Sequence, residues 1–136
     1  MLEEILIETP GQGLYEITSE VQGVVVKSGV TSGLCTVFIQ HTSASLIIQE
    51  NAASSAKQDL EKWLSRLVPE ADKLYTHTDE GPDDMPSHIK SILTQVSISI
   101  PISGSCVALG AWQGIYLWEH RRRSHQRTVL VQILAD

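Results

Sequence analysis

The side chains best suited to chemistry gather first in an acidic stretch in the middle of the chain. From Glu70 to Asp84 there are six acidic residues and one lysine, and His77 and His88 lie within and just beyond this stretch. Imidazole nitrogens and carboxylate oxygens together suit zinc or another divalent cation, with magnesium favoured where oxygen ligands dominate. The spacing of the two histidines matches no standard metal motif. The same residues also fit a solvated acidic loop before a helix N-terminus, where negative charge is favourable, so both interpretations stay open.

A second polar group, His41-Thr42-Ser43-Ala44-Ser45, interrupts an otherwise apolar pair of strand-like segments. Such a break is unfavourable unless its polar groups are hydrogen-bonded or lie at a rim. One interpretation is a cradle for an anion or a substrate, with His41 as metal ligand or acid–base group. An ordinary hairpin turn is the second. A hydrolase with Ser43 as nucleophile and His41 as base is the third, although the chain lacks the GxSxG nucleophile elbow.

The third group is basic and follows a predicted strand near the C-terminus. Glu119 to Arg127 contains four arginines and one glutamate, and it begins Glu119-His120-Arg121. Guanidinium groups match phosphate geometry, so Arg121 is a candidate substrate contact, with a solvated turn as the alternative. Adjacent strand residues point to opposite faces, so Glu119 and His120 cannot both face one site without a bulge. If the site handles a phosphorylated substrate, we expect this group and the acidic stretch to meet around it, because each neutralises the other.

A glycine-bracketed segment, 110–114, adds an aromatic and an amide side chain. Trp112 could line a pocket by stacking, with Gln113 beside it, although a tryptophan is more often core or interface. The chain contains no dinucleotide fingerprint, no P-loop and no HExxH motif.

These groups must be positioned by a mixture of strands and helices. Apolar residues at spacings of three and four predict a helix over 51–68, with Trp63, Leu64 and Leu67 on one face. A second helix is predicted over 86–95, with its apolar residues inward, and a third after Thr18. Strands are predicted over 2–8, 14–17, 34–40, 45–49, 97–100, 106–109, 115–120 and 128–134. Short connections favour antiparallel pairing, so the expected fold is α+β: a mixed, mostly antiparallel sheet with two to three helices packed on one face.

Composition bounds the class of protein. A chain of 136 residues makes about one domain, and 42% hydrophobic with 19% charged residues excludes intrinsic disorder. A net charge of −6 disfavours nucleic acid as a partner, and no stretch approaches the ~20 apolar residues of a membrane span. The N-terminus lacks a signal-peptide pattern. Cys35 and Cys106 form no CxxC pair and are expected to be buried in a reducing cytosol, so the predicted location is cytoplasmic.

Several runs of the sequence occur together in an order typical of one family. They are His41-Thr42-Ser43-Ala44-Ser45-Leu46, Glu50-Asn51-Ala52, Asp59-Leu60, Tyr75-x-His77, the segment 80–90, the segment 109–116, and Glu119-His120-Arg121. In these runs the chain resembles the YjbQ family, also called the secondary thiamine-phosphate synthase family, over nearly its whole length. The resemblance implies a single YjbQ-like domain over residues 1–136. It also implies a small cytosolic protein that forms homotrimers, with a metal-associated site near the subunit boundary.

The same resemblance implies an activity. Family members are linked to a weak thiamine-phosphate synthase activity, a transferase reaction that joins a pyrimidine diphosphate to a thiazole phosphate and releases pyrophosphate. A divalent metal ion, Zn or Mg, and arginines would neutralise the leaving pyrophosphate. The alternatives are a non-catalytic trimer that binds a metal or an anionic metabolite, and the Ser/His hydrolase.

Matched positions supply the predicted site residues. The metal ligands implied are His41, His77 and His88, with His120 as a fourth candidate. The catalytic candidates are His41, Ser43, Asp84 and Glu119. The candidates for binding a small phosphorylated substrate are Thr42, Trp112, Gln113 and Arg121.

Overall fold

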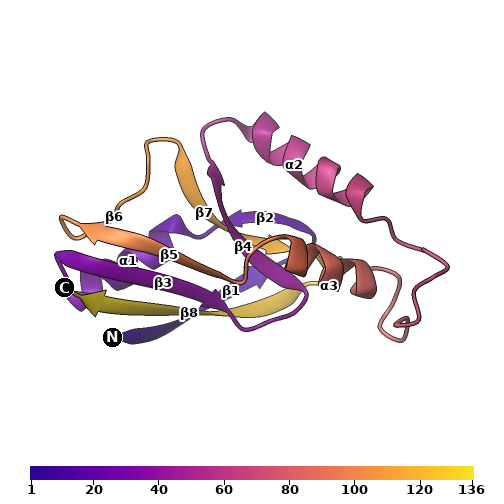
Figure 1. The fold of residues 1–136 in the computed structure, drawn as a ribbon, viewed down its shortest axis with the longest axis horizontal. Coiled ribbons are helices and arrows are strands. Elements are labelled where there is room, and N and C mark those ends of the chain that lie inside the picture. Colours follow the sequence, from indigo (N-terminus) through magenta and orange to yellow (C-terminus); the bar gives the residue numbers. More distant parts are fainter.

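Eight strands and three helices make up the chain, which the computed structural model describes over residues 1–136 (Figure 1). In chain order they are β1 (Leu2–Thr9), β2 (Gly13–Glu16), α1 (Thr18–Ser28), β3 (Ser32–Ile39), β4 (Ala44–Glu50), α2 (Ser54–Leu67), α3 (Asp84–Leu93), β5 (Ser97–Ser103), β6 (Cys106–Val107), β7 (Gln113–Glu119) and β8 (His125–Ala135). Every predicted strand and helix is present, with bounds that differ by a few residues. The α+β class is confirmed.

The strands form two antiparallel sheets where a single mixed sheet was expected. One sheet has the order β1-β8-β3-β5-β6, and the other has the order β2-β7-β4. The run His41–Ser43 lies where the chain leaves β3 in the first sheet and enters β4 in the second, so it is a corner between sheets and not a hairpin turn. Alternation along a strand shows which residues share a face, but it does not show which strand is the neighbour. The division into two sheets was therefore hidden from the sequence.

The main core lies between the two sheets and α1. Alternating residues of β3, β5 and β8 point into it, and Ile115 and Leu117 of β7 meet them from the second sheet. On the opposite face of β7, Tyr116 and Trp118 pack under α2 with Leu64 in a smaller cluster. β7 is thus covered on both faces, which explains why its sequence is continuously apolar.

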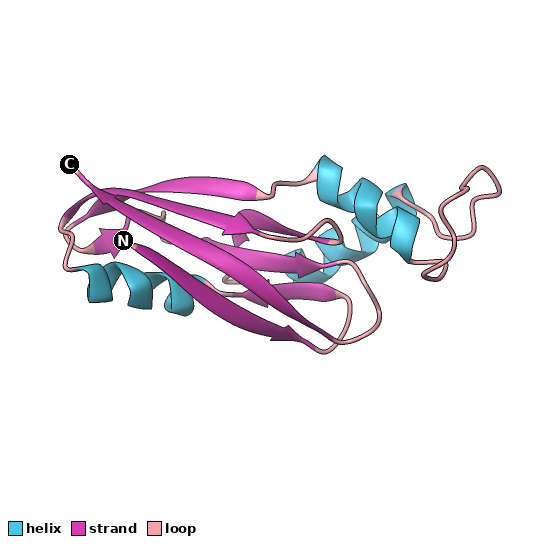
Figure 2. Ribbon diagram, turned by 90° about the horizontal axis from the view of Figure 1, so that it is seen from below, coloured by secondary structure: helices cyan, strands magenta, loops and turns pink.

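The helices do not share one face of a single sheet. Figure 2 shows α1 near the chain termini, whereas the other two helices lie at the opposite end of the molecule. None of the three is both long enough and apolar enough to cross a bilayer.

The inward face of α3 differs from the prediction. Ile92 is 80% exposed and Leu93 is 55% exposed, whereas Asp84, Ser87 and Lys90 are buried. The reason is that α3 packs on strand ends whose carbonyls need donors: the Ser87 hydroxyl donates to the His120 carbonyl at 2.9 Å. Ser87 on the polar face of α3 therefore satisfies a backbone carbonyl, and Ile92 and Leu93 face outward, whereas Ile89 packs against the smaller cluster.

Two further expectations about burial were wrong. On α2 only Leu64 is buried, while Trp63 and Leu67 are each 52% exposed, because a single stripe of the helix contacts the second sheet. Cys35 is buried, and burial raises the pKa of its thiol to about 11, but Cys106 is exposed on the two-residue edge strand β6.

Candidate functional site

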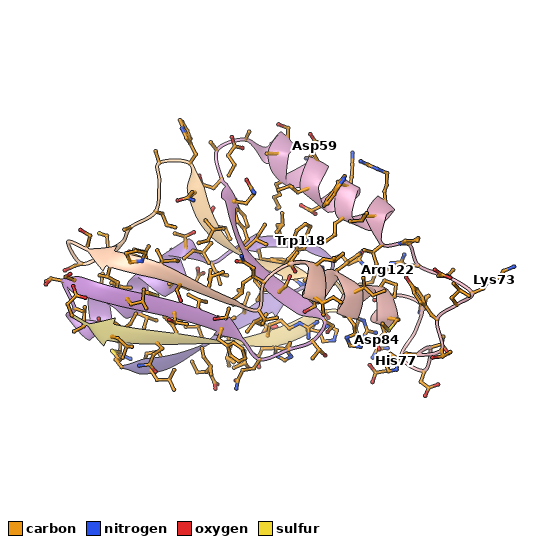
Figure 3. All side chains as sticks on the ribbon, in the orientation of Figure 1. Asp59, Lys73, His77, Asp84, Trp118 and Arg122 are labelled. Carbon is orange, nitrogen blue, oxygen red and sulfur yellow. The ribbon has the colours of Figure 1, made fainter.

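Three side chains from the acidic stretch and α3 converge on one point. Nε2 of His77 lies 2.8 Å from Oδ2 of Asp84, and Nε2 of His88 lies 3.3 Å from the same oxygen. One candidate ligand atom from each residue falls within 4.8 Å of the others. Asp84 and His88 share a face of α3 because they are four residues apart, and His77 reaches them from the preceding loop. Figure 3 shows His77 and Asp84 together at the start of α3.

The hydrogen bond on the far side of His88 determines what its Nε2 presents to Asp84. Nδ1 of His88 lies 2.9 Å from the Thr42 carbonyl, and a carbonyl oxygen can only accept. Nδ1 therefore carries a proton, and in the neutral ring Nε2 directs a lone pair at Oδ2 of Asp84. Two acceptors at 3.3 Å repel each other unless a cation, either a proton or a metal ion, lies between them. The arrangement also matches the outer hydrogen bonds that orient metal-ligating histidines.

The acidic stretch and the arginines meet at this cluster, as expected. Arg121 donates from Nη1 to Oδ1 of Asp84 at 2.9 Å, from Nε to Oδ2 of Asp83 at 3.1 Å, and from Nη2 to the Glu80 carbonyl at 2.8 Å. Arg122 pairs with Glu70 at 2.6 Å. Burial alone would raise the pKa of Asp83, but the Arg122 amide and the Arg121 guanidinium outweigh it and lower that pKa. The guanidinium of Arg121 is thus committed to carboxylates, and it holds Asp84 in place.

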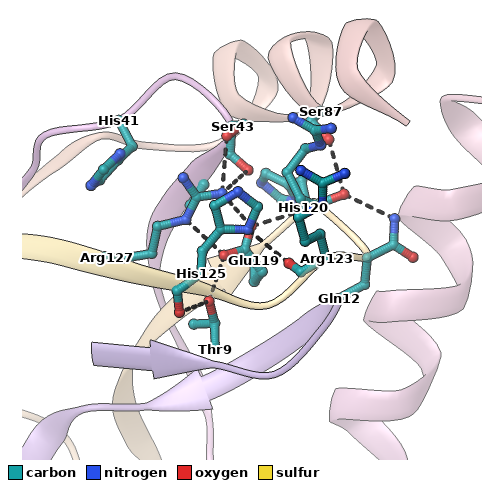
Figure 4. Close-up of polar contacts among 12 residues, drawn as sticks. Thr9, Gln12, His41, Ser43, Ser87, Glu119, His120, Arg123, His125 and Arg127 are labelled. Carbon is teal, nitrogen blue, oxygen red and sulfur yellow. Dashed lines mark hydrogen bonds and ion pairs between the residues drawn. The ribbon is translucent and has the colours of Figure 1, made fainter. Parts of the chain in front are cut away.

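Behind the cluster lies a buried ion pair, drawn in Figure 4. Arg127 donates from Nε to Oε1 of Glu119 at 2.7 Å and from Nη2 to Oε2 at 2.5 Å. Thr9 donates to Oε1 at 2.6 Å, and the Arg121 amide donates to Oε2 at 3.1 Å. Burial would raise the pKa of Glu119, but these hydrogen bonds lower it. Glu119, predicted as catalytic, is enclosed within this network and faces no cavity as a free carboxylate.

The Ser/His hydrolase pair does not form. The Ser43 hydroxyl accepts from Nη2 of Arg127 at 2.9 Å, and Nε2 of His41 accepts from the Thr128 amide at 3.2 Å. A nucleophile and its base need a mutual hydrogen bond, and none joins Ser43 to His41. Both side chains are committed to β8 instead.

Two of the four histidines predicted as ligands lie outside the metal cluster. His120 is buried on the other side of its strand from Glu119, as alternation requires, and its Nε2 contacts the Ser45 hydroxyl at 2.9 Å. Burial, with Lys90 and Arg127 nearby, lowers the pKa of His120 to about 3, so it is neutral. His41 is turned toward Thr128 of β8, and burial lowers its pKa. Asp84, predicted as catalytic, occupies the ligand position in their place.

A cavity adjoins the cluster at His88. It measures about 670 Å³ and is also lined by His41 and Thr42, so these predicted residues do share a site with His88. Small-molecule sites commonly span about 300–1,000 Å³. Since Nε2 of His41 accepts a hydrogen bond, its ring proton lies on Nδ1. The cavity can therefore hold a small molecule between the candidate metal cluster and a neutral imidazole.

Trp112 and Gln113 are not brought to this site. They lie at the start of β7, whereas Glu119 ends it, and about 3.3 Å per residue separates the two ends widely. Trp112 is 66% exposed, and the Gln113 amide accepts from the backbone of Gly110 at 2.7 Å. Strand geometry alone could have indicated this separation.

Sequence reasoning also missed three residues. Arg127 and Thr9 complete the Glu119 network, and they come from strands more than 100 residues apart in the chain. Lys90 is buried on the polar face of α3. The one available signal was the polar character of that face.

The fold and the cluster define a class: a small α+β protein of two antiparallel sheets with a candidate histidine–carboxylate metal centre. Residues 3–136 match the family described as UPF0047 protein YjbQ-like, and the chain belongs to this YjbQ/UPF0047 family. It is 53% identical to the UPF0047 protein sll1880 of Synechocystis sp. over 98% of this chain and 91% of that protein. It is 35% identical to the UPF0047 protein YjbQ of Escherichia coli O157:H7 over 97% and 96%, respectively.

Solved structures agree with the fold. A crystal structure of a YjbQ/UPF0047 family protein from Clostridium acetobutylicum superposes with a TM-score of 0.89 at 34% identity, and it covers 97% of this chain and 99% of its own. A conserved hypothetical protein from Thermus thermophilus gives a TM-score of 0.87 at 30% identity, with coverage of 97% and 99%.

Proposed function

We propose that this chain is a metal-dependent enzyme acting on a phosphorylated small molecule, and that its reaction is the thiamine-phosphate synthase transfer. The observation that carries the proposal is the pair of acceptors, Nε2 of His88 and Oδ2 of Asp84, held 3.3 Å apart beside a cavity. A divalent cation relieves that repulsion while the Thr42 carbonyl keeps the His88 ring in place.

The donor set suits a particular kind of metal. Two imidazoles and one carboxylate favour zinc or a similar transition metal over magnesium, which prefers oxygen ligands. Three protein ligands that leave further positions open are typical of catalytic zinc sites. When bound, such an ion supplies a Lewis acid that neutralises charge on a phosphate or a leaving pyrophosphate.

The chain's own residues would divide the remaining work. Arg121 is a positioning residue: by occupying Oδ1 of Asp84 it leaves Oδ2 directed at both histidines. His41 and Thr42 line the substrate cavity, where the Nδ1–H of the neutral imidazole and the Thr42 hydroxyl can donate hydrogen bonds to a substrate. Ser43 and Glu119 act as support, because their polar atoms are taken up by Arg127.

The metal is tested first. We expect elemental analysis of untagged protein to find about one divalent ion per chain in the wild type and in His125→Ala, a matched control. The His77→Ala/His88→Ala double variant should lose it. Full metal content in the double variant would end the proposal.

The position of Arg121 gives a second, independent readout. Arg121→Met should weaken metal affinity about 10–100-fold, as loss of an outer-shell partner typically does. Arg123→Met changes an exposed arginine and should leave affinity unaltered. Equal metal affinities in the two variants would show that Arg121 does not position the metal ligands.

Activity decides between the alternatives. Purified metal-loaded protein should form product from a pyrimidine diphosphate and a thiazole phosphate, and the double variant should not. Bound metal without turnover on phosphorylated substrates would indicate a non-catalytic binding protein. Chelator-insensitive hydrolysis that is lost in Ser43→Ala would indicate the hydrolase.

We also propose a homotrimer in the cytoplasm. Large apolar side chains on the outer face of the five-stranded sheet support association, because uncovered apolar surface favours a partner. They include Leu2, Leu6, Phe38 and Leu134, which are 59%, 51%, 41% and 55% exposed. Light scattering should give three times the chain mass of 15.0 kDa, and a stable monomer at micromolar concentration would contradict it.

A further inference from the structure

Lys90 is a buried cation without a protein partner. The residue is 6% exposed, and its ammonium group makes neither a hydrogen bond nor an ion pair. No fully enclosed polar atom in the structure lacks a partner, so this ammonium group must reach open space. Lys90 lines two cavities, one of about 380 Å³ beside α2 and one of about 340 Å³ that Glu70 and Arg122 also line, and the first of them is the candidate ligand site. An unpaired buried charge is costly, so its presence needs a reason.

The cavity collects further positive charge. Lys62 and Arg66 of α2 line it, and neither forms an ion pair. Glu61 also lines the cavity; Glu119 does so too, but its carboxylate is fully buried against Arg127, which leaves the Glu61 carboxylate against three cations. A concave wall with an excess of one sign attracts a ligand of the opposite sign.

Other residues that line the cavity indicate which kind of chemical group the anionic ligand carries besides its charge. Trp118 forms part of the wall at the end of β7, and the Gln12 amide is held by the His120 carbonyl at 2.9 Å (Figure 4). The volume exceeds that of a bare phosphate and lies within the range of small-molecule sites. An organic group can therefore lie against Trp118 while an anionic group reaches Lys90.

The cavity is separate from the metal cluster. Lys90 lies two residues after His88, which at 3.6 residues per turn puts it on nearly the opposite side of α3. The two cavities share no lining residue. A ligand here does not require a metal at His77, Asp84 and His88.

We infer that this cavity binds the phosphate group of a small phosphorylated molecule, held by Lys90 together with Arg66 and Lys62. Arginine presents a fork that matches a tetrahedral oxyanion, and lysine adds a point charge. A bound anion pairs with the Lys90 ammonium group, which has no ion-pair partner within the protein. The site goes beyond the proposed activity and does not depend on it.

Titration calorimetry in metal-free buffer tests the inference, with inorganic phosphate and phenyl phosphate as probes. We expect saturable binding of both at one site per chain. Lys90→Met should weaken both by at least about tenfold, the usual effect of losing a hydrogen bond to a charged group. Lys57→Met, on α2 but outside the cavity, should change affinity less than about twofold.

Folding does not confound the test. Lys90→Met removes a buried unpaired charge and keeps most of the side-chain volume, so it should be at least as resistant to urea as the wild type. The double variant Lys62→Met/Arg66→Met alters only exposed positions and should also weaken phosphate binding.

Competing anions decide the chemistry. Sulfate should displace phosphate, because it is a tetrahedral dianion, and acetate should not. Absence of phosphate binding, unaltered affinity in Lys90→Met, exclusion of phenyl phosphate, or displacement by acetate as effective as by sulfate would each overturn the inference.

Discussion

Breaking the Glu119–Arg127 ion pair tests whether the core of the site is held together as described. The side chains are 0% and 4% exposed, and two hydrogen bonds join them at 2.7 and 2.5 Å. Arg127→Met removes both bonds and leaves a buried carboxylate whose remaining donors are the Thr9 hydroxyl and the Arg121 amide. Arg127→Met should lower the free energy of unfolding by about 3–5 kcal/mol, because it removes two charge-assisted hydrogen bonds and one partner of a buried ion pair. That is a large share of the roughly 5–15 kcal/mol of a typical domain.

Changing both partners of the ion pair gives a sharper test than changing Arg127 alone. Glu119→Gln/Arg127→Met removes both charges and retains an oxygen for the Thr9 hydroxyl, so it should be more stable than Arg127→Met. Urea unfolding followed by tryptophan fluorescence at pH 7 supplies the four free energies of unfolding. Their coupling energy should exceed about 1 kcal/mol. Additive single effects, or an Arg127→Met variant within about 1 kcal/mol of the wild type, would refute the reasoning.

The pH dependence of stability follows from the direction in which the pair shifts the pKa of Glu119. The folded-state pKa of Glu119 is lowered, so the stability that it contributes is complete above the unfolded carboxyl pKa of about 4.3 and is lost as the pH falls through the folded value. Asp83 also has a lowered pKa and adds a loss of the same sign. In Arg127→Met the cation that lowers the Glu119 pKa is gone, so burial raises that pKa and the variant gains stability relative to the wild type as the carboxylate is protonated. The stability gap between wild type and variant should therefore narrow as the pH falls from 7. A gap that widens in acid would contradict the assignment.

Three more outcomes are expected. The ring of His120 should show no titration by NMR between pH 5 and 8, because burial lowers its pKa to about 3. Thiol titration of the native protein should modify the exposed Cys106 and spare the buried Cys35, which should react only after unfolding. Leu64→Ala should lower the free energy of unfolding by about 2–5 kcal/mol, whereas Leu67→Ala, at a half-exposed position of the same helix, should change it by less than about 0.5 kcal/mol.

Local sequence patterns were sufficient to predict the helices and strands and one feature of the site. The alternation of Ile98, Ile100 and Ile102 predicts a strand with one buried face, because side chains alternate across a strand whatever its neighbours are. If the site handles a phosphorylated substrate, charge balance predicts that the acidic stretch and Arg121 meet around it, because each group neutralises the other. The contacts of Arg121 with Asp83 and Asp84 show that the two groups meet.

Tertiary structure decided which histidines face Asp84 and which face of α3 is inward. His41 and His88 both lie near a corner between sheets. The Thr128 amide donates a hydrogen bond to the His41 ring, whereas the Thr42 carbonyl accepts one from His88 and orients its ring toward Asp84. Those backbone groups come from distant parts of the chain, so no local spacing encodes them. Apolar periodicity also placed Ile92 and Leu93 of α3 inward, although they are exposed, for the same reason. Hydrophobic residues prefer burial, but unpaired strand-end carbonyls need donors, and only the assembled sheets determine where those carbonyls lie.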